Sequence, residues 1–477
     1  MPKIGILVVA YNAATTLAAV LDRIPEDFRP HIHEVLVADD HSQDSTYLVG
    51  VGYRETSDLP LRIVKHPENL GYGGNQKWGY QWAIDHGWDI VVLLHGDGQY
   101  APELLDQMVA PIERGDADAV FGSRIMHRGE ARRGGMPAYK YLGNRILTTM
   151  QNKVVGTDLS EWHSGYRAYR VDALARLPLE KNSDGFNFDT EVIIQLHEAG
   201  MRIEEIPIPT YYGDEICYVN GLGYARDVTG DVVRYRLHKM GFGTGDLAFS
   251  SSGYELKEDA DSSHGTIARW MGMRSPNRVL DLGCADGSLG ALLVDQGHDV
   301  VGVDLHESPG VRDRLRDFYE ADLEKGIPSA VGDGYDTVVA ADVLEHVRDP
   351  RATLDQIRDV LRPGGTLIAS IPNFGHWYPR GRVALGLFDY DARGILDRDH
   401  VRFFTRRSFE RLLESAGWQV RRVEATGIPL GVVERGAAPD AAAPGTARTV
   451  LGKVSRAATV VRPQLFGYQF IYELTPA

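Results

Sequence analysis

Acidic side chains stand directly after several short apolar runs of this sequence. In the first half Asp39 and Asp40 follow one run, and His95 and Asp97 follow another. Carboxylates in such places can accept hydrogen bonds from a nucleobase and from ribose, and they can hold a divalent cation beside a diphosphate. The Gly-rich stretch 69–75 can bring backbone N–H groups close to phosphates. This half therefore suits a nucleotide that is bound together with a metal ion.

The second half carries a different set of residues, which suits a nucleoside without a metal. Small residues at a turn allow a ligand to approach the backbone, and acidic residues at strand ends can bind ribose hydroxyls and an adenine amino group. The set consists of Asp281, Gly283, Ala285, Gly287, Asp304 and Asp322. Taken singly, each stretch also fits an ordinary strand–turn–helix connection. The order of the stretches along the chain distinguishes a ligand site from such a connection.

Short apolar runs that predict buried strands alternate with amphipathic stretches that predict helices. The predicted strands are 4–10, 34–38, 61–64, 90–94 and 118–122, and then 278–282, 299–303, 336–340 and 366–371. Such alternation predicts two α/β domains, each with a mostly parallel sheet covered by helices on both faces. Ligands bind such sheets at the carboxyl ends of the strands, which is where the acidic residues lie.

The chain of 477 residues is too long for one hydrophobic core. Gly- and Ser-rich stretches between 241 and 253 predict a junction. We therefore expect a first domain at 1–245, a linker at 246–263 and a second domain at 264–477. In the second domain, 446–462 is expected to form a helix and 465–474 an edge strand.

Composition excludes several classes of protein. Two cysteines rule out a disulfide scaffold, and a formal charge of −15 argues against nucleic acid as a partner. No apolar run reaches the roughly 18 to 20 residues that span a bilayer. A cytoplasmic protein is expected. The basic amphipathic stretch 224–240 either packs on its own domain or makes peripheral contact with the inner face of a membrane.

In order, the motifs of the first half resemble the family 2 glycosyltransferases of GT-A fold, most of all the branch that transfers sugars to polyprenyl phosphates. The motifs are Val9-Ala10-Tyr11-Asn12, Asp39-Asp40-x-Ser42-x-Asp44, Asn69 to Gly74, His95-x-Asp97-Gly98-Gln99, Gly122-Ser123-Arg124, Ser164-Gly165-Tyr166-Arg167 and Phe188-Asp189-Thr190-Glu191. The resemblance implies inverting sugar transfer from a nucleotide sugar to a polyprenyl-phosphate or glycan acceptor, with Mg²⁺ or Mn²⁺.

The same resemblance implies roles for individual residues. Nucleotide-sugar binding falls to Tyr11, Asn12, Asp39, Asp40, Gly73, Arg124 and Arg167, metal binding to Asp97 with His95, and catalysis to Asp97, Glu161, Asp189 and Glu191. A hydroxyl acceptor would need one of these carboxylates as a base, whereas a phosphate acceptor would not. His95 stands where the family has Asp: either it ligates the metal, or it hydrogen-bonds a phosphate and leaves Asp97 as the metal carboxylate.

The second half resembles the class I S-adenosylmethionine-dependent methyltransferases, whose fold is Rossmann-like. The resemblance rests on 281–287, on Asp304, on the stretch 341–347 and on the turn 361–367. It implies S-adenosylmethionine as cofactor, bound by Asp281, Gly283, Ala285, Gly287, Asp304, Asp322 and Asp342. His346, His376 and His400 are candidate acceptor-side residues; for His400, the neighbouring Asp399 is expected to raise its basicity as a catalytic base.

We therefore predict a bifunctional transferase that adds a sugar and methylates a hydroxyl in cell-surface glycan or glycolipid biosynthesis. Two alternatives stay open at this point. The first half is either an active transferase or a degenerate nucleotide-sugar-binding module beside an active methyltransferase. The chain also fits a natural-product tailoring enzyme.

Overall fold

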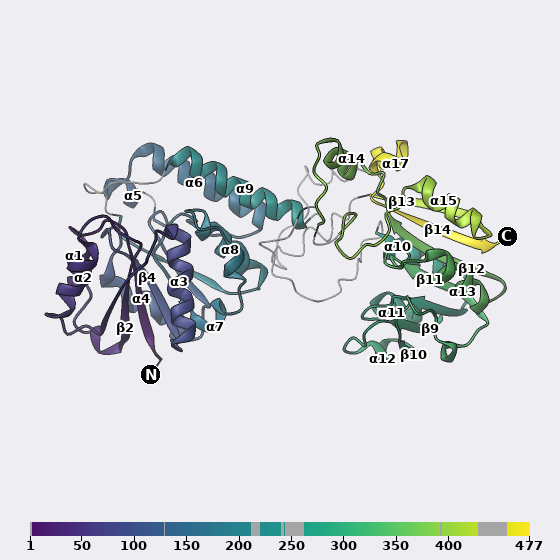
Figure 1. Cartoon of the computed structure of the whole chain (residues 1–477), viewed down its shortest axis with the longest axis horizontal. Helices are drawn as coiled ribbons and strands as arrows, with labels where there is room; N and C mark the ends of the chain where they lie inside the picture. The colour runs from purple at the N-terminus through teal and green to yellow at the C-terminus, as the bar shows by residue number, and fades with distance from the viewer. Residues whose placement is uncertain are drawn as a thin grey trace. The chain divides into compact units, whose positions relative to one another are not determined.

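The computed structural model describes residues 2–127, 129–210, 220–239, 243, 262–391, 394–427 and 456–477. These residues form two compact units. One reaches to Arg236, and the other holds Leu237–Lys239, Gly243 and everything described from Ser262 onward (Figure 1). Both are α/β units, as predicted. Most of the expected linker lies outside the described residues, and its last residue already belongs to a helix, Ser263–Met271.

The first unit is built on a seven-stranded mixed sheet of order β3-β2-β1-β4-β6-β5-β7. Its strands are β1 Ile4–Ala10, β2 Ile32–Asp39, β3 Leu61–Lys65, β4 Ile90–His95, β5 Ala119–Ser123, β6 Arg167–Arg170 and β7 Ile203–Pro207. Strand β6 runs antiparallel to β4 and β5, and the other pairs are parallel. Strands β1, β2 and β4 therefore end side by side, and their loops share one edge.

Helices cover both faces of this sheet. They are α1 Leu17–Asp22, α2 Thr46–Arg54, α3 Gly71–Asp85, α4 Leu105–Glu113, α5 Glu130–Arg133, α6 Ala138–Val155, α7 Val171–Leu174, α8 Phe188–Glu198 and α9 Gly221–Lys239. One core joins α3, α8 and α9 to the sheet, and a second core joins α1 and α4 to it. Helix α9 buries Val228, Val232 and Tyr235. Packing on its own unit thus accounts for the buried apolar side chains of α9.

The second unit has a seven-stranded sheet of order β10-β9-β8-β11-β12-β14-β13. Its strands are β8 Arg278–Leu282, β9 Asp299–Asp304, β10 Asp317–Glu320, β11 Tyr335–Ala341, β12 Leu361–Pro372, β13 Trp418–Thr426 and β14 Gln469–Pro476. Strand β14 is antiparallel to both β12 and β13. The expectation of an edge strand at 465–474 is therefore wrong, because β14 lies inside the sheet and β13 forms the edge.

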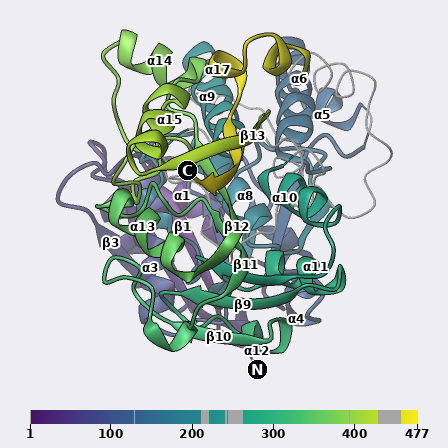
Figure 2. The ribbon, with the colours of Figure 1, turned by 90° about the vertical axis from the view of Figure 1, so that its right-hand side faces the viewer.

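The helices of this unit are α10 Ser263–Met271, α11 Ser288–Asp295, α12 Val311–Arg314, α13 Pro350–Val360, α14 Trp377–Ala384, α15 Arg406–Ser415 and α17 Pro463–Phe466. One core contains side chains of α13 and α15, and another contains side chains of α10, α11 and α12. Figure 2 shows the ribbon of these helices. Of the helix expected at 446–462, only 456–462 lies within the described residues, and 456–461 of it is helical.

Four non-glycine residues among those described have a positive φ: Asn12, His41, Ala285 and Asp342, with φ between 50° and 58°. Each follows the carboxyl end of a parallel strand, namely β1, β2, β8 and β11. Such a backbone costs about 1 to 2 kcal/mol for a residue with a side chain, and it gathers at functional sites. The strained turns thus coincide with the loops in which the sequence predicts ligands.

Candidate active sites

The loops after β1 and β2 are tied to each other at the edge of the first sheet. The Asn12 N–H donates to Ser42 Oγ over 2.9 Å, and Asn12 Oδ1 accepts from the Gln43 N–H over 2.9 Å. Tyr11, beside them, is 40% exposed. Asn12 therefore shapes the predicted nucleotide loop, and Tyr11 presents an aromatic ring at its surface.

The two adjacent aspartates at the end of β2 do different work. Asp39 is buried, and its Oδ2 has no hydrogen-bond partner in the described part of the chain, with Lys65 Nζ 3.9 Å away. Asp40 instead accepts from the backbone N–H groups of Leu70 and Gly71, at 2.7 and 3.1 Å. Burial raises the pKa of Asp40. Asp39 is thus the better placed of the two to accept a hydrogen bond from a ligand, and Asp40 holds the loop before α3.

Gly73 serves packing in this structure. Its N–H, predicted to approach phosphates, donates to Asp184 O over 2.8 Å. A side chain there would place Cβ 2.5 Å from Ser183 O and 2.7 Å from Phe188 Cβ. The close approach that requires glycine is therefore to the protein itself.

A hydrogen-bonded chain runs from Asp189 through Tyr72 to His95. The Tyr72 hydroxyl donates to Asp189 Oδ2 over 2.8 Å and lies 3.4 Å from His95 Nε2. Because the hydroxyl has one hydrogen and gives it to Asp189, it can only accept from His95. The imidazole then carries its hydrogen on Nε2 and keeps the lone pair on Nδ1.

His95 is enclosed by aromatic rings at the end of β4. Tyr72 and Tyr100 pack edge-on against it, with ring centroids 5.6 and 4.9 Å away. Burial lowers the pKa of His95, although Asp97 and Asp189 act against this. Asp97, partly buried, accepts from the Gln99 N–H over 3.1 Å. A neutral imidazole and a carboxylate therefore stand two residues apart at one strand end.

Arg124 and Glu161 form a buried ion pair. The carboxylate accepts from the Arg124 N–H over 2.6 Å, from the Arg124 side chain, and from Asn144 Nδ2 over 2.7 Å. Burial opposes the charge of Glu161, but Arg124 outweighs it and lowers the pKa of Glu161. A carboxylate held in this way is a weak base, which argues against the catalytic role predicted for Glu161.

Arg167, on β6, is 1% exposed, and the protein uses its hydrogen-bond donors. It donates to the carbonyl oxygens of Ser164, Asp189 and Trp162 over 3.0 to 3.1 Å, and Nη1 lies 3.6 Å from Asp189 Oδ1. These contacts give Arg167 a positioning role within the protein, and its contact with a nucleotide sugar stays a prediction. Arg167 positions Asp189, which in turn orients His95 through Tyr72.

Glu191 lies two residues after Asp189 on α8, about half a helical turn away, and has a different environment. It accepts from the Ser183 N–H over 2.7 Å, and its neighbour Asn187 donates to Asp231 of α9 over 2.9 Å. Burial raises the pKa of Glu191 to about 7, with Asp231 adding to the effect. Asp189, not Glu191, is the acidic residue that reaches His95.

The predicted cofactor loop of the second unit joins β8 to α11. Gly283 and Gly287 have positive φ, and a side chain at Gly283 would place Cβ 2.7 Å from Val343. The Ala285 N–H donates to Asp304 Oδ2 over 2.7 Å, which ties this loop to the end of β9. Asp281 lies beneath the loop, where burial and Asp304 raise its pKa to about 7. The residues expected to cradle a nucleoside are thus brought together.

Asp322 and Asp342 follow β10 and β11, the strands on either side of the pair β9 and β8. Asp342 Oδ1 accepts from the Ser370 hydroxyl over 2.6 Å, and Oδ2 accepts from Gln469 Nε2 over 2.7 Å. Asp322, just after β10, accepts from the Glu324 N–H over 3.0 Å. The strands therefore deliver Asp304, Asp322 and Asp342 to one edge of the sheet, in agreement with the sequence pattern.

The candidate histidines of the second unit divide into two groups. His376 is fully buried and caps α14 by accepting from the Tyr378 N–H over 3.3 Å. His346 and His400 instead lie together, with ring centroids 4.8 Å apart. Burial lowers the pKa of His400, and His346 lowers it further. The net shift of the His400 pKa is therefore downward, whereas the sequence suggested a more basic His400.

Two positioning residues were not identified from sequence. Tyr72 lies inside the stretch 69–75, which suggested only backbone contacts. Gln469 reaches Asp342 across 127 positions of sequence. A role for Gln469 can be inferred only once its strand is known to lie beside β12. That neighbourhood depends on the order of strands in the sheet.

Both halves match known families. Residues 5–177 match the family model described as glycosyl transferase family 2, and residues 264–423 match the one described as methyltransferase domain. The chain joins a family 2 glycosyltransferase domain to a methyltransferase domain. The predicted pair of transferase families and the two α/β folds are thereby confirmed.

Each of the following relatives matches only one of the two domains. An undecaprenyl-phosphate mannosyltransferase from Micrococcus luteus is 29% identical over 40% of this chain and 75% of that protein. A UDP-N-acetylglucosamine–dolichyl-phosphate N-acetylglucosaminyltransferase from Methanococcus voltae is 27% identical over 44% and 86%. A ubiquinone biosynthesis O-methyltransferase from Aeromonas salmonicida is 30% identical over 30% of this chain and 63% of its own.

Proposed function

We propose that the glycosyltransferase unit transfers a sugar from a nucleoside diphosphate to a polyprenyl phosphate, with inversion at the anomeric carbon. The observation that carries this proposal is the convergence on His95 of Asp97 and Asp189 at the edge where Asp39 also lies. The relatives support the acceptor class, because both glycosyltransferase names contain a prenyl-linked phosphate, whereas their sugars differ.

The side chains at the end of β4 fit a divalent cation. His95 offers a neutral imidazole with its lone pair on Nδ1, and Asp97 offers a carboxylate two residues later. A bound Mg²⁺ or Mn²⁺ supplies positive charge to the diphosphate leaving group. His95 and Asp97 would hold that ion, and Asp39 would orient the nucleoside.

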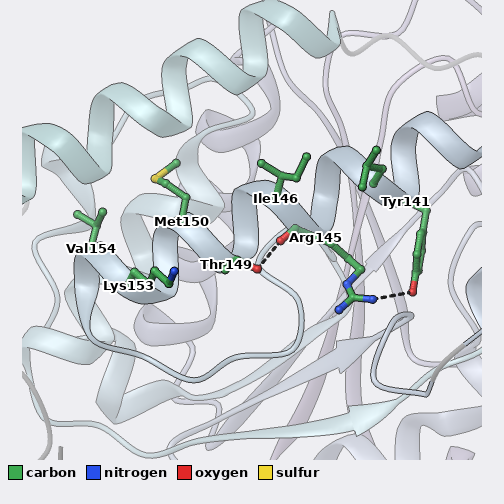
Figure 3. A pocket seen from close by; sticks show the side chains of 8 residues that line it. Tyr141, Arg145, Ile146, Thr149, Met150, Lys153 and Val154 are labelled. Carbon is green, nitrogen blue, oxygen red and sulfur yellow. Dashed lines mark hydrogen bonds between the residues drawn. The ribbon is translucent and has the colours of Figure 1, made fainter. Parts of the chain in front are cut away.

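A groove along α6 supports a lipid acceptor (Figure 3). It has a volume of about 630 Å³, and its apolar wall includes Leu142 and Ile146, which are 60% and 59% exposed. Arg145 and Lys153 stand on the same helix and complement a phosphate. From the same helix Asn144 reaches Glu161 in the active site. We assign the groove to the isoprenoid chain of the acceptor.

A phosphate acceptor also agrees with the state of the carboxylates. Glu161 is held by Arg124, and Asp189 is engaged by Tyr72 and Arg167. A polyprenyl phosphate is already an anion at neutral pH, so its oxygen attacks without a base. In this mechanism Asp189 orients His95 and removes no proton.

The sugar transfer is tested with the full chain, Mn²⁺, a panel of nucleotide sugars, and undecaprenyl phosphate in vesicles. We expect a lipid-linked sugar from at least one donor, and none from Asp97→Ala. A soluble glycan glycosylated in preference to the lipid would overturn the acceptor assignment. Nucleotide-sugar binding without transfer to any acceptor would favour the alternative of a binding module.

For the second unit the proposal is methyl transfer to a hydroxyl of a sugar or related acceptor. S-adenosylmethionine supplies the methyl group on a positively charged sulfur. Asp304, fixed by the Ala285 N–H, would accept hydrogen bonds from its ribose, and Asp322 would face its adenine. The O-methyltransferase relative supports a hydroxyl as the methylated group.

We further propose that the two units act on one product in glycolipid assembly, at the inner face of the membrane. Labelled S-adenosylmethionine and the purified chain test this, with glycosylated and unglycosylated polyprenyl phosphate as acceptors. Faster methylation of the glycosylated lipid is expected. Equal rates would show that the activities are independent, as in a tailoring enzyme.

A further inference from the structure

Three metal-ligating side chains meet on the acceptor side of the methyltransferase unit. Glu345, His346 and His400 each bring one ligand atom to within 4.8 Å of the other two. Glu345 and His400 are buried and His346 is exposed, so the cluster is partly enclosed and still open to solvent. The function proposed above does not use it.

Backbone hydrogen bonds hold the two contributing loops together. Glu345 and His346 follow β11, whereas His400 comes from the segment before α15. The Val401 and Arg402 N–H groups both donate to Glu345 O, over 3.0 and 2.9 Å. The three side chains are therefore positioned before any ligand arrives, which lowers the entropic cost of binding one.

The protein also selects the tautomer of both rings. His346 Nδ1 lies 3.1 Å from Asp399 O, and His400 Nδ1 lies 3.3 Å from Ile395 O. A carbonyl oxygen only accepts, so each Nδ1 carries the hydrogen and each Nε2 keeps a lone pair. Metal-binding histidines are oriented in this way, with the second ring nitrogen donating to a carbonyl or a carboxylate.

We propose that Glu345, His346 and His400 bind a divalent transition-metal ion to which the acceptor of methyl transfer presents its hydroxyl. This inference rests on the methyl transfer proposed above. Two imidazoles and one carboxylate favour Mn²⁺, Fe²⁺, Co²⁺ or Zn²⁺ over Ca²⁺. Three protein ligands leave coordination positions open, as in catalytic metal sites.

The place of the cluster suits such a role. Asp342, at the predicted cofactor site, precedes Glu345 by three residues on the same loop. A bound cation favours ionisation of an attached hydroxyl, whose proton passes to water. The new O–C bond forms while the methyl C–S bond breaks, and S-adenosylhomocysteine leaves with the sulfur electron pair. Methyl, charge and proton are thereby balanced without an oxidant or reductant.

The surroundings indicate the class of acceptor. Phe403 lies beside His400 with ring centroids 6.2 Å apart, and Phe374, Phe388 and Tyr390 extend the aromatic wall. A six-coordinate ion held by three protein ligands has room for two neighbouring oxygens of one acceptor. The structure therefore points to an acceptor with vicinal oxygens on a ring that can stack on an aromatic face.

Binding of Co²⁺ alone to the chelator-treated full chain tests the site. Because His95 and Asp97 can bind metal as well, all proteins carry His95→Ala and Asp97→Ala, and calorimetry counts the ions. We expect one Co²⁺ per chain in this background. His346→Ala, at an exposed position, and Glu345→Gln should each weaken binding at least tenfold, since even the partners of metal ligands contribute ten- to hundredfold. His306→Ala, another exposed histidine of this unit, is the matched control.

No Co²⁺ bound in this background, or affinities unchanged by both ligand variants, would overturn the site. Binding of S-adenosylmethionine, measured in parallel, shows that each variant is folded. If the ion binds but no hydroxyl is methylated with or without it, the proposed function fails and the ion site stands. If methylation continues undiminished after complete metal removal, the ion has no role in the transfer.

Discussion

At the scale of single residues, the glycosyltransferase site depends on groups that touch no ligand themselves. Arg167 is buried against Asp189, Asp189 accepts from Tyr72, and Tyr72 sets the tautomer of His95. We expect loss of the Tyr72 hydroxyl in particular to change which nitrogen of His95 holds the lone pair. The substitution of His for the family's Asp is therefore accompanied by a supporting arrangement of its own.

Tyr72→Phe tests that arrangement with the loss of a single oxygen. Without the hydroxyl, His95 loses the partner that selects its tautomer, so Mn²⁺ affinity should fall roughly tenfold or more. Calorimetric titration with Mn²⁺ and UDP measures the change. Tyr139→Phe, at a position 73% exposed on α6, is the control and should change nothing. Equal Mn²⁺ affinities for the wild type, Tyr72→Phe and Tyr139→Phe would contradict the proposed hydrogen-bonded connection from Asp189 to His95.

Glu191 predicts a pH-dependent stability. Its pKa is about 7 in the fold and about 4.3 when unfolded, so the folded state keeps a proton that the unfolded state has lost. Stability is therefore lost as the pH rises from about 5 to 8. Glu191→Gln should remove roughly 2 to 3 kcal/mol of that loss. Urea unfolding at several pH values measures it, and the exposed Glu113→Gln should retain the wild-type slope.

Ala285 predicts a gain in stability. With φ of 50° it adopts a backbone that glycine adopts more easily. Ala285→Gly should raise the free energy of unfolding of the methyltransferase unit by about 0.5 to 1 kcal/mol, because relief of strain exceeds the added chain entropy. Thermal unfolding with a probe specific to that unit measures this. A lower melting temperature would show that the turn is not strained.

At the scale of elements, the strand ends were predictable and the partners of their side chains were not. Apolar runs identify β1, β2, β4, β8 and β9, and parallel pairing puts their carboxyl ends together, so Asp97 and Asp304 could be found from sequence. The pairing of Arg124 with Glu161, or of Gln469 with Asp342, depends on tertiary packing between distant segments. Strand β6, Arg167–Arg170, has no apolar pattern and was missed.

Helix α6 supports a prediction about the acceptor. Leu142→Glu and Ile146→Glu place charge on the apolar wall of the groove, and each should raise the KM for undecaprenyl phosphate about ten- to hundredfold. That range corresponds to the roughly 1.5 to 3 kcal/mol of burying one such side chain. The activity with a short, water-soluble prenyl phosphate should be unaffected. Equal effects on both acceptors would place the lipid chain elsewhere.

At the scale of the whole molecule, each unit has hydrophobic cores of its own, so we predict that the two proposed activities are separable. The cores of the first unit and those of the second contain residues from their own unit only, within the described chain. Each unit therefore holds its own candidate site at the edge of its own sheet.

The described helices include none that is both long and apolar enough to cross a bilayer.

Asp97→Ala should abolish sugar transfer and spare methyl transfer, and Asp304→Ala should do the reverse. The physical reason is that each carboxylate lies at the edge of a different sheet. Paired assays on the two variants, with melting curves to show that both fold, measure it. Loss of both activities in a folded variant would mean that the units depend on each other.

The interior position of β14 has a consequence for biosynthesis. It fills the space between β12 and β13, although both are made earlier on the ribosome. Until Gln469–Pro476 emerges, β12 and β13 each have an unpaired edge, and such edges readily pair with other chains. Nascent chains stalled shortly before this segment should accordingly be the species most in need of a chaperone.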